Sequence, residues 1–117
     1  MADKDAIKNR LDKMVKKLEE VGPDVAEGWG GTILFKIVDL DIGWMMKFAQ
    51  DGTVESLEEK IDEDAATSIL EFKSGAFIDV FNGKVPPAQA KGIGDMRVYK
   101  SIDALVAIMP EVIEKED

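Results

Sequence analysis

Apolar residues near the start of the chain recur every three or four positions, which is the period of an α-helix. This stripe consists of Ile7, Leu11, Met14, Leu18 and Val21, with lysines and acids between them. We therefore predict an amphipathic N-terminal helix of about five turns within residues 1–22. We expect it to end there, because Gly22 can adopt the left-handed cap conformation and Pro23 cannot continue a helix.

The pattern in the middle of the chain is typical of β-strands. Residues 32–39 and 42–50 are rich in Ile, Val, Phe, Trp and Met, and the short segment between them favours a hairpin. A second turn at Asp51-Gly52 leads to residues 53–60. This third segment is more polar, so we predict that it lies at the edge of a sheet or faces solvent.

The second half of the chain alternates short strands with helices. We predict strands over residues 65–71 and 95–100, and between them a helix capped by Ser74 and a short helix that begins at Pro87. Helical spacing returns in residues 101–115. Within this C-terminal helix we expect Ser101 to be the N-cap and Pro110 to bend or split the helix, since proline lacks the N–H that would bond to Val106.

The composition removes most catalytic chemistry. The 117 residues include no cysteine and no histidine, which excludes disulfides, thiolate nucleophiles, sulfur-based metal sites and histidine acid–base catalysis. We predict no cofactor and no metal. A hydrophobic content of 45% is enough for the core of one domain, so we expect a single domain over residues 1–117.

The net charge of −9 argues against partners with anionic surfaces. It comes from 15 basic and 24 acidic residues, and it repels nucleic acids. No apolar run is long enough to span a bilayer, and the N-terminus has no secretory apolar region. We expect a cytoplasmic protein without stable membrane insertion. The lysines of the first helix leave transient membrane contact open, and the oligomeric state is also open.

The order of motifs between residues 30 and 110 resembles the sterol carrier protein domain family. A strand bears Trp44 and is followed by the Asp51-Gly52 turn, as in that family. The next matching motifs, in order, are Asp64-Ala65-Ala66-Thr67, Gly83-Lys84-Val85-Pro86-Pro87, Ala90 and Gly94. The chain departs from the family pattern at Lys91, where an aromatic residue is usual, and at Lys100, where a second glycine is usual.

The resemblance implies an α+β fold with one five-stranded, mostly antiparallel sheet, covered on one face by helices. It also implies an apolar cavity that holds a long-chain fatty acid, a fatty acyl-CoA or a sterol, without catalysis. The lipid-lining residues that we predict are Trp44, Met46, Phe48, Phe77, Phe81, Leu105, Val106 and Met109. Alternation along the strand places Trp44 and Met46 on the inner face and Met45 on the other. Lys91 or Lys100 is a hypothetical partner for a carboxylate or a CoA phosphate.

Other functions are compatible with the same sequence. The chain could be an accessory or interaction domain with a filled core, which docks a partner through Val112 and Ile113 of its C-terminal helix. Asp39 and Asp41 could form a carboxylate pair for acid–base catalysis, although residues so spaced commonly face solvent. The acids 62–64 lack the ligand spacing of a calcium loop, so we predict a solvated turn there.

Overall fold

The computed structural model describes residues 2–115, so residues 1, 116 and 117 of the predicted domain lie outside the described part. Its helices are α1 (Lys4–Val25), α2 (Ser74–Phe81), α3 (Pro87–Gly92) and α4 (Leu105–Val112). Its strands are β1 (Thr32–Ile37), β2 (Ile42–Phe48), β3 (Val54–Glu59), β4 (Ser68–Phe72) and β5 (Met96–Lys100). None of the described helices is long and apolar enough to cross a membrane.

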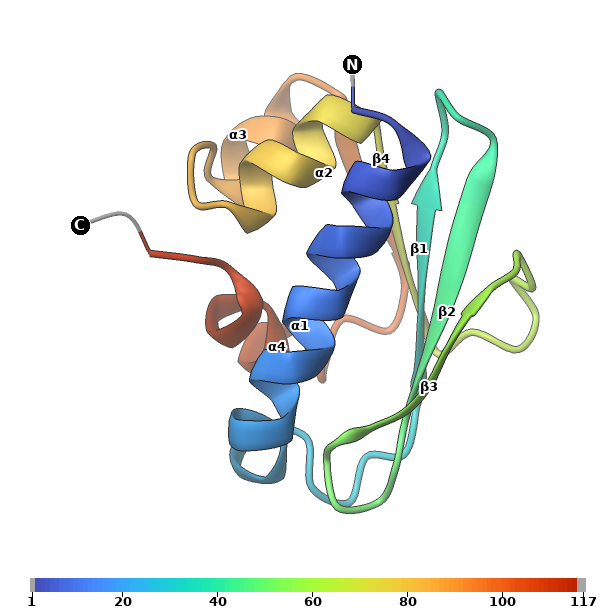
Figure 1. Cartoon of the computed structure of the whole chain (residues 1–117), viewed down its shortest axis with the longest axis vertical. Helices are drawn as coiled ribbons and strands as arrows, with labels where there is room; N and C mark the ends of the chain where they lie inside the picture. Colours follow the sequence, from blue (N-terminus) through green and yellow to red (C-terminus); the bar gives the residue numbers. More distant parts are fainter. Residues whose placement is uncertain (1, 116–117) are drawn as a thin grey trace.

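The strands form one sheet in the order β3-β2-β1-β4-β5. Only the central pair, β1 and β4, is parallel, and the other three pairs are antiparallel. The helices lie on one side of the sheet, with α1 running along it and α2 and α3 near one end (Figure 1). The predicted fold class and the edge position of the third strand are therefore confirmed.

The inner face of the sheet carries the main hydrophobic core. Trp44, Met46 and Phe48 all point toward the helices, and their neighbours across the strand pair, Phe35 and Ile33, do the same. Met45 belongs instead to a small apolar cluster on the opposite face. The alternation predicted for this strand is thus confirmed.

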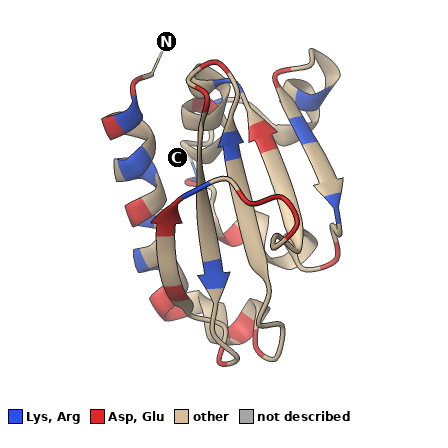
Figure 2. Ribbon diagram, turned by 90° about the vertical axis from the view of Figure 1, so that its right-hand side faces the viewer, with Lys and Arg blue, Asp and Glu red and all other residues tan. Residues whose placement is uncertain are grey.

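Part of the outer face is covered by the loop between β3 and β4, which crosses the strands in Figure 2. This loop is held by the ammonium group of Lys100, which donates hydrogen bonds to the carbonyls of Glu63 at 2.6 Å and Ala66 at 2.8 Å. Lys100 adopts a left-handed backbone with φ of 63°. That conformation favours glycine, the residue usual at this position in the family that the sequence resembles, and the bonds from the amine offset its cost.

Helix α1 continues beyond its predicted end, through Gly22 and Pro23 to Val25. Gly22 is not a cap. It lies where the helix touches the β2–β3 turn, and a Cβ atom there would overlap the backbone carbonyl of Gly52. The glycine therefore serves a close approach of two backbones, which a helix-ending rule cannot distinguish from a cap.

Helix α4 is shorter than the predicted 101–115, covering Leu105–Val112. Ser101 does not cap it, because the Ser101 carbonyl accepts a hydrogen bond from the Ser68 hydroxyl at 2.6 Å and this contact keeps the residue beside the sheet. Pro110 lies inside the helix, which is not split there.

Helix α2 begins at Ser74, but its cap comes from a distant residue. The carboxylate of Asp39, in the β1–β2 turn, accepts hydrogen bonds from the Ser74 backbone N–H at 2.8 Å and from its hydroxyl at 2.7 Å. Burial alone would raise the pKa of Asp39, but these hydrogen bonds hold that pKa below its ordinary value. The predicted role of Ser74 as the cap is therefore corrected, since it is a donor to the carboxylate that caps the helix.

We predict that Gly22→Ala destabilises the protein. The new methyl group must separate α1 from the β2–β3 turn, at a cost of about 1 to 3 kcal/mol that exceeds the gain in helix propensity. Urea denaturation followed by circular dichroism measures the change. Gly75→Ala is the matched control, because a Cβ atom there meets open space within a helix. Equal effects of the two substitutions would contradict the proposed close approach.

We predict that Asp39→Asn lowers the free energy of unfolding by about 1 kcal/mol at pH 7, because the charged acceptor at the start of α2 is lost. The pKa of Asp39 is lowered in the folded state, so its stabilisation is present above the unfolded-state pKa and disappears as the pH falls through the folded-state pKa. The difference from wild type should therefore shrink below about pH 4.

Urea titrations at pH 7 and pH 3 test this expectation. Asp41→Asn is the control, since it lies in the same turn at φ of 53°, a conformation that asparagine also tolerates. A difference between wild type and Asp39→Asn that stays constant across this pH range would refute the role assigned to the ionised carboxylate.

Candidate functional site

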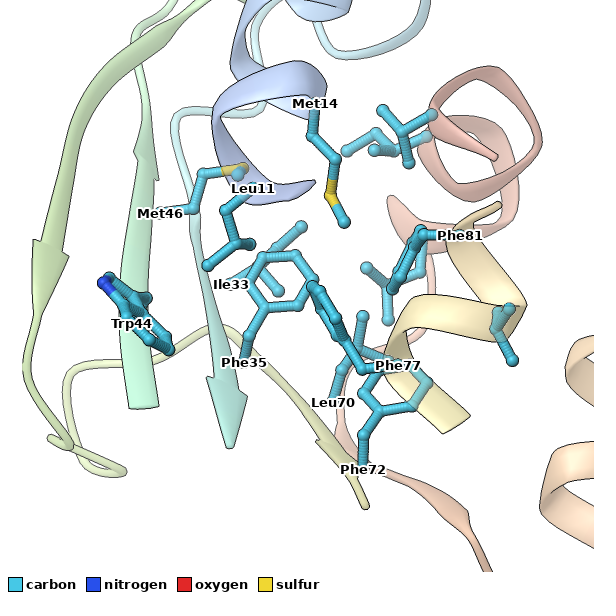
Figure 3. Packing of buried hydrophobic residues seen from close by; sticks show 14 of the residues in the cluster. Leu11, Met14, Ile33, Phe35, Trp44, Met46, Leu70, Phe72, Phe77 and Phe81 are labelled. Carbon is cyan, nitrogen blue, oxygen red and sulfur yellow. The ribbon is translucent and has the colours of Figure 1, made fainter. Parts of the chain in front are cut away.

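The space between the sheet and α2 is occupied by four phenylalanines (Figure 3). Phe35 and Phe72 come from β1 and β4, and Phe77 and Phe81 come from α2. Their ring centroids lie 4.9 to 6.2 Å apart in edge-on or tilted pairs. Such arrangements are the preferred ones for aromatic rings, so this part of the interior is well packed.

All the predicted lining residues except Val106 belong to this interior. Trp44, Met46, Phe48, Phe77, Phe81 and Leu105 are buried members of one core cluster, and the half-buried Met109 packs against it. Val106 is 70% exposed and lies outside the interior. The prediction that Val106 lines the interior is therefore wrong. Neighbouring residues of a helix point about 100° apart, so Val106 faces away when Leu105 faces inward.

Several residues of the same interior were not among the predicted lining residues. Phe35 and Phe72 supply half of the aromatic group, and Leu11 and Met14 approach it from α1 (Figure 3). The signals were present, since Leu11 and Met14 belong to the stripe of the first helix. The register of the sheet, which pairs Phe35 with Trp44, was the missing information.

Arg10 closes one side of the interior and is 4% exposed. Its guanidinium donates hydrogen bonds to the carbonyls of Phe81 and Val112, the last residues of α2 and α4, and the second of these bonds measures 3.0 Å. The same group lies 6.0 Å from the centre of the Phe81 ring. Burial lowers the pKa of Arg10, and the nearby charge of Glu114 partly offsets this effect.

A groove of about 480 Å³ opens outside Arg10, between α1 and the C-terminal segment. We call it the Arg10 groove. It is lined by Arg10, Lys13, Lys16, Lys17, Glu20, Pro110, Glu111, Val112, Ile113, Glu114 and Lys115. Five of these side chains are basic and three are acidic, so the groove is locally positive although the whole chain carries a charge of −9.

A second groove, of about 430 Å³, lies beside α2 and α3 and includes Asp39, Asp79 and Asp95. Two of its acids are already engaged, because Asp39 caps α2 and Asp95 pairs with Lys73 at 3.2 Å. In the described part of the chain, no three acidic residues are grouped so as to hold a metal ion. The acids at 62–64 form a largely exposed turn, as predicted.

The basic residues considered for a head group take different positions. The amine of Lys100 is bound to loop carbonyls on the outer face of the sheet, so it does not reach the interior. Lys91 lies on α3 and is exposed. The residues that bring positive charge next to the interior are instead Arg10 and the α1 lysines at positions 13, 16 and 17. These lysines alternate with acids in the sequence, which predicts a solvated face, and Arg10 was not singled out.

No protein-family model matches the chain, and no curated protein matches it significantly. The fold, however, is well represented among solved structures. Sterol carrier protein-2 from Aedes aegypti, solved in solution as a complex with the C16 fatty acid palmitate, has a TM-score of 0.72 and 18% identity. The alignment covers 99% of this chain and 100% of that one.

Two further structures show the fold in other contexts. The ubiquinone synthesis protein UbiJ-SCP2 has a TM-score of 0.65 and 10% identity over 96% of this chain and 93% of that one. A double mutant of the sec-alkyl sulfatase PisA1 has a TM-score of 0.73 and 13% identity over 92% of this chain, which spans only 16% of the sulfatase. The chain therefore has the fold of the sterol carrier protein 2 domain, as the sequence resemblance predicted.

Proposed function

We propose that this domain binds a long-chain lipid in the apolar interior between its sheet and its helices, and that it catalyses no reaction. The proposal rests on a structural similarity that extends over nearly the whole chain of a sterol carrier protein solved with palmitate, together with the buried apolar interior. Asp39 was considered as a catalytic acid, but its carboxylate accepts two hydrogen bonds from Ser74 and caps α2, which is a structural role.

The energetics favour such a function. Burying a methylene group stabilises by about 0.8 kcal/mol, so a sixteen-carbon chain gains on the order of 12 kcal/mol gross. Immobilisation of the ligand and the protein costs several kcal/mol of this gain, which leaves an affinity in roughly the micromolar to nanomolar range. The methionines Met14, Met46 and Met109 can repack around tails of different shape, so low selectivity for the tail is expected.

Binding requires the interior to open, because phenylalanine rings fill the space beside α2. The sheet is held by backbone pairing between all neighbouring strands, whereas α4 packs mainly on α1. We therefore infer that α4 is the element that separates and lets a tunnel form. Fatty acid, fatty acyl-CoA and sterol are the proposed ligands, carried in the cytoplasm and released by transient membrane contact.

A second candidate function is supported by one observation. Val106 is 70% exposed and Ile102 is 54% exposed, so the region of α4 presents apolar side chains to solvent. An interaction domain would use them to dock a partner. Val112 is buried in the core, which corrects one of the two docking residues predicted from the sequence, whereas Ile113 is partly exposed. A complex that depends on Ile102 and Val106, in protein that binds no lipid, would favour this function.

We predict that Leu105→Trp weakens lipid binding about tenfold or more, because the added ring occupies the interior beside α4. The measurement is displacement of a fluorescent fatty acid from delipidated protein by palmitate, palmitoyl-CoA, cholesterol and ubiquinone. Val106→Trp is the matched control, since the neighbouring side chain faces solvent. It should bind as wild type does.

The folded state of Leu105→Trp must be checked, since overpacking a core costs about 1 to 3 kcal/mol. Leu105→Phe gives a smaller increase in volume if the first variant unfolds. Saturable binding to wild type that neither Leu105 variant weakens would place the ligand outside the interior. Absence of binding to folded wild-type protein would overturn the proposed function.

A further inference from the structure

We propose that the Arg10 groove is a binding site for an oxyanion, a carboxylate or a phosphate, and that this oxyanion is the head group of the bound lipid. The inference rests on the proposed function and adds to it the head-group class and the residues that select it. Arg10 forms the floor of the site, and Lys13, Lys16 and Lys17 form its rim.

The first reason is a buried positive charge with no carboxylate in ion-pair contact, although the charge of Glu114 lies near enough to act on it. Arg10 forms no ion pair within residues 2–115, and its Nε atom is buried with no hydrogen-bond partner. The carbonyls at the ends of α2 and α4 compensate the charge only in part, as partial charges at helix C-termini. A guanidinium offers a planar set of donors that matches carboxylate and phosphate geometry.

The second reason is the unequal engagement of the rim lysines. Lys13 approaches Glu114 at 3.8 Å, a long and solvent-exposed pair. Lys16 and Lys17 form no ion pair within the described residues. The other half of the helix differs, because Lys4 pairs with Glu59 at 2.7 Å and Lys8 pairs with Asp12 at 2.7 Å. The α1 lysines at the groove are therefore less engaged by carboxylates of residues 2–115 than those in the other half of the helix.

The third reason is continuity between the groove and the interior. Val112 lines the groove and also belongs to the buried core, and Pro110 and Ile113 add apolar surface beside it. An amphiphile can therefore place its charged end in the groove and its tail in the core. As α4 moves away, its carbonyl releases Arg10, and the oxyanion takes that position, where it accepts a hydrogen bond and brings the full negative charge that a carbonyl lacks.

The test compares ligands of one chain length with different head groups. Palmitate, hexadecyl phosphate and neutral hexadecanol compete for a fluorescent fatty acid on delipidated protein at pH 8 and low salt. Inorganic phosphate, titrated separately and followed by amide NMR shifts of α1, reports a free anion. We expect the two anionic lipids to bind at least about tenfold more tightly than hexadecanol, a preference that falls as salt rises.

The variants locate the site. Lys13→Gln combined with Lys17→Gln should remove most of the preference for anionic lipids and leave hexadecanol affinity unchanged. Lys4→Gln combined with Lys8→Gln removes the same charge from the same helix outside the groove, and it should leave the preference intact. Arg10→Met should abolish the preference, and the rim variant, which changes only exposed side chains, decides the test if Arg10→Met does not fold.

The outcomes separate the two proposals. Equal affinity for all three lipids, unaffected by the rim variant, overturns the head-group site and leaves lipid binding standing. A second outcome is that the protein binds no lipid but shows amide shifts with inorganic phosphate that depend on Lys13 and Lys17. This result supports a site for a free oxyanion and overturns its assignment to a lipid head group. No response to any lipid or to phosphate overturns both proposals.

Discussion

The helical layer depends on the buried guanidinium of Arg10. Two helices that are far apart in sequence, α2 and α4, end at carbonyls that this one side chain binds. The Phe81 carbonyl also accepts the backbone N–H of Glu114 at 2.9 Å, which ties the segment after α4 to the end of α2. Carbonyls at a helix end are costly when buried without partners, so α1 must lie where Arg10 can reach both.

The position of α2, in turn, determines how the interior is filled. Asp39 fixes the start of this helix and Arg10 fixes its end, and between them Phe77 and Phe81 are directed at the sheet. The five strands are joined by backbone pairing, with one register shift between β2 and β3, whereas the last helix touches mainly another helix. A domain built in this way can change the volume of its interior without breaking strand pairs. Core packing and ligand binding are then compatible, because different layers are responsible for them.

Much of the fold could be predicted because local signals agreed with the tertiary structure. Alternation along β2 assigned Trp44 and Met46 to the inner face, and helical spacing placed Leu105 correctly. Prediction failed where a residue serves a contact with a distant segment. Gly22 has the signature of a helix cap, yet it is required by Gly52 thirty positions away. Arg10 was not singled out from the sequence, yet it is buried and binds the ends of two other helices.

Val106 and Arg10 show why the candidate site was harder to predict than the fold. Val106 was predicted to line the interior and is 70% exposed, whereas Arg10 was not predicted as a site residue and is 4% exposed. Hydropathy ranks single residues, but burial depends on which face of a helix meets its neighbours and on whether a polar group finds partners. A charged residue is buried only where its partners are arranged to receive it. The carbonyls of α2 and α4 supply such partners in the closed domain, and any ligand that separates these helices must supply a replacement for them.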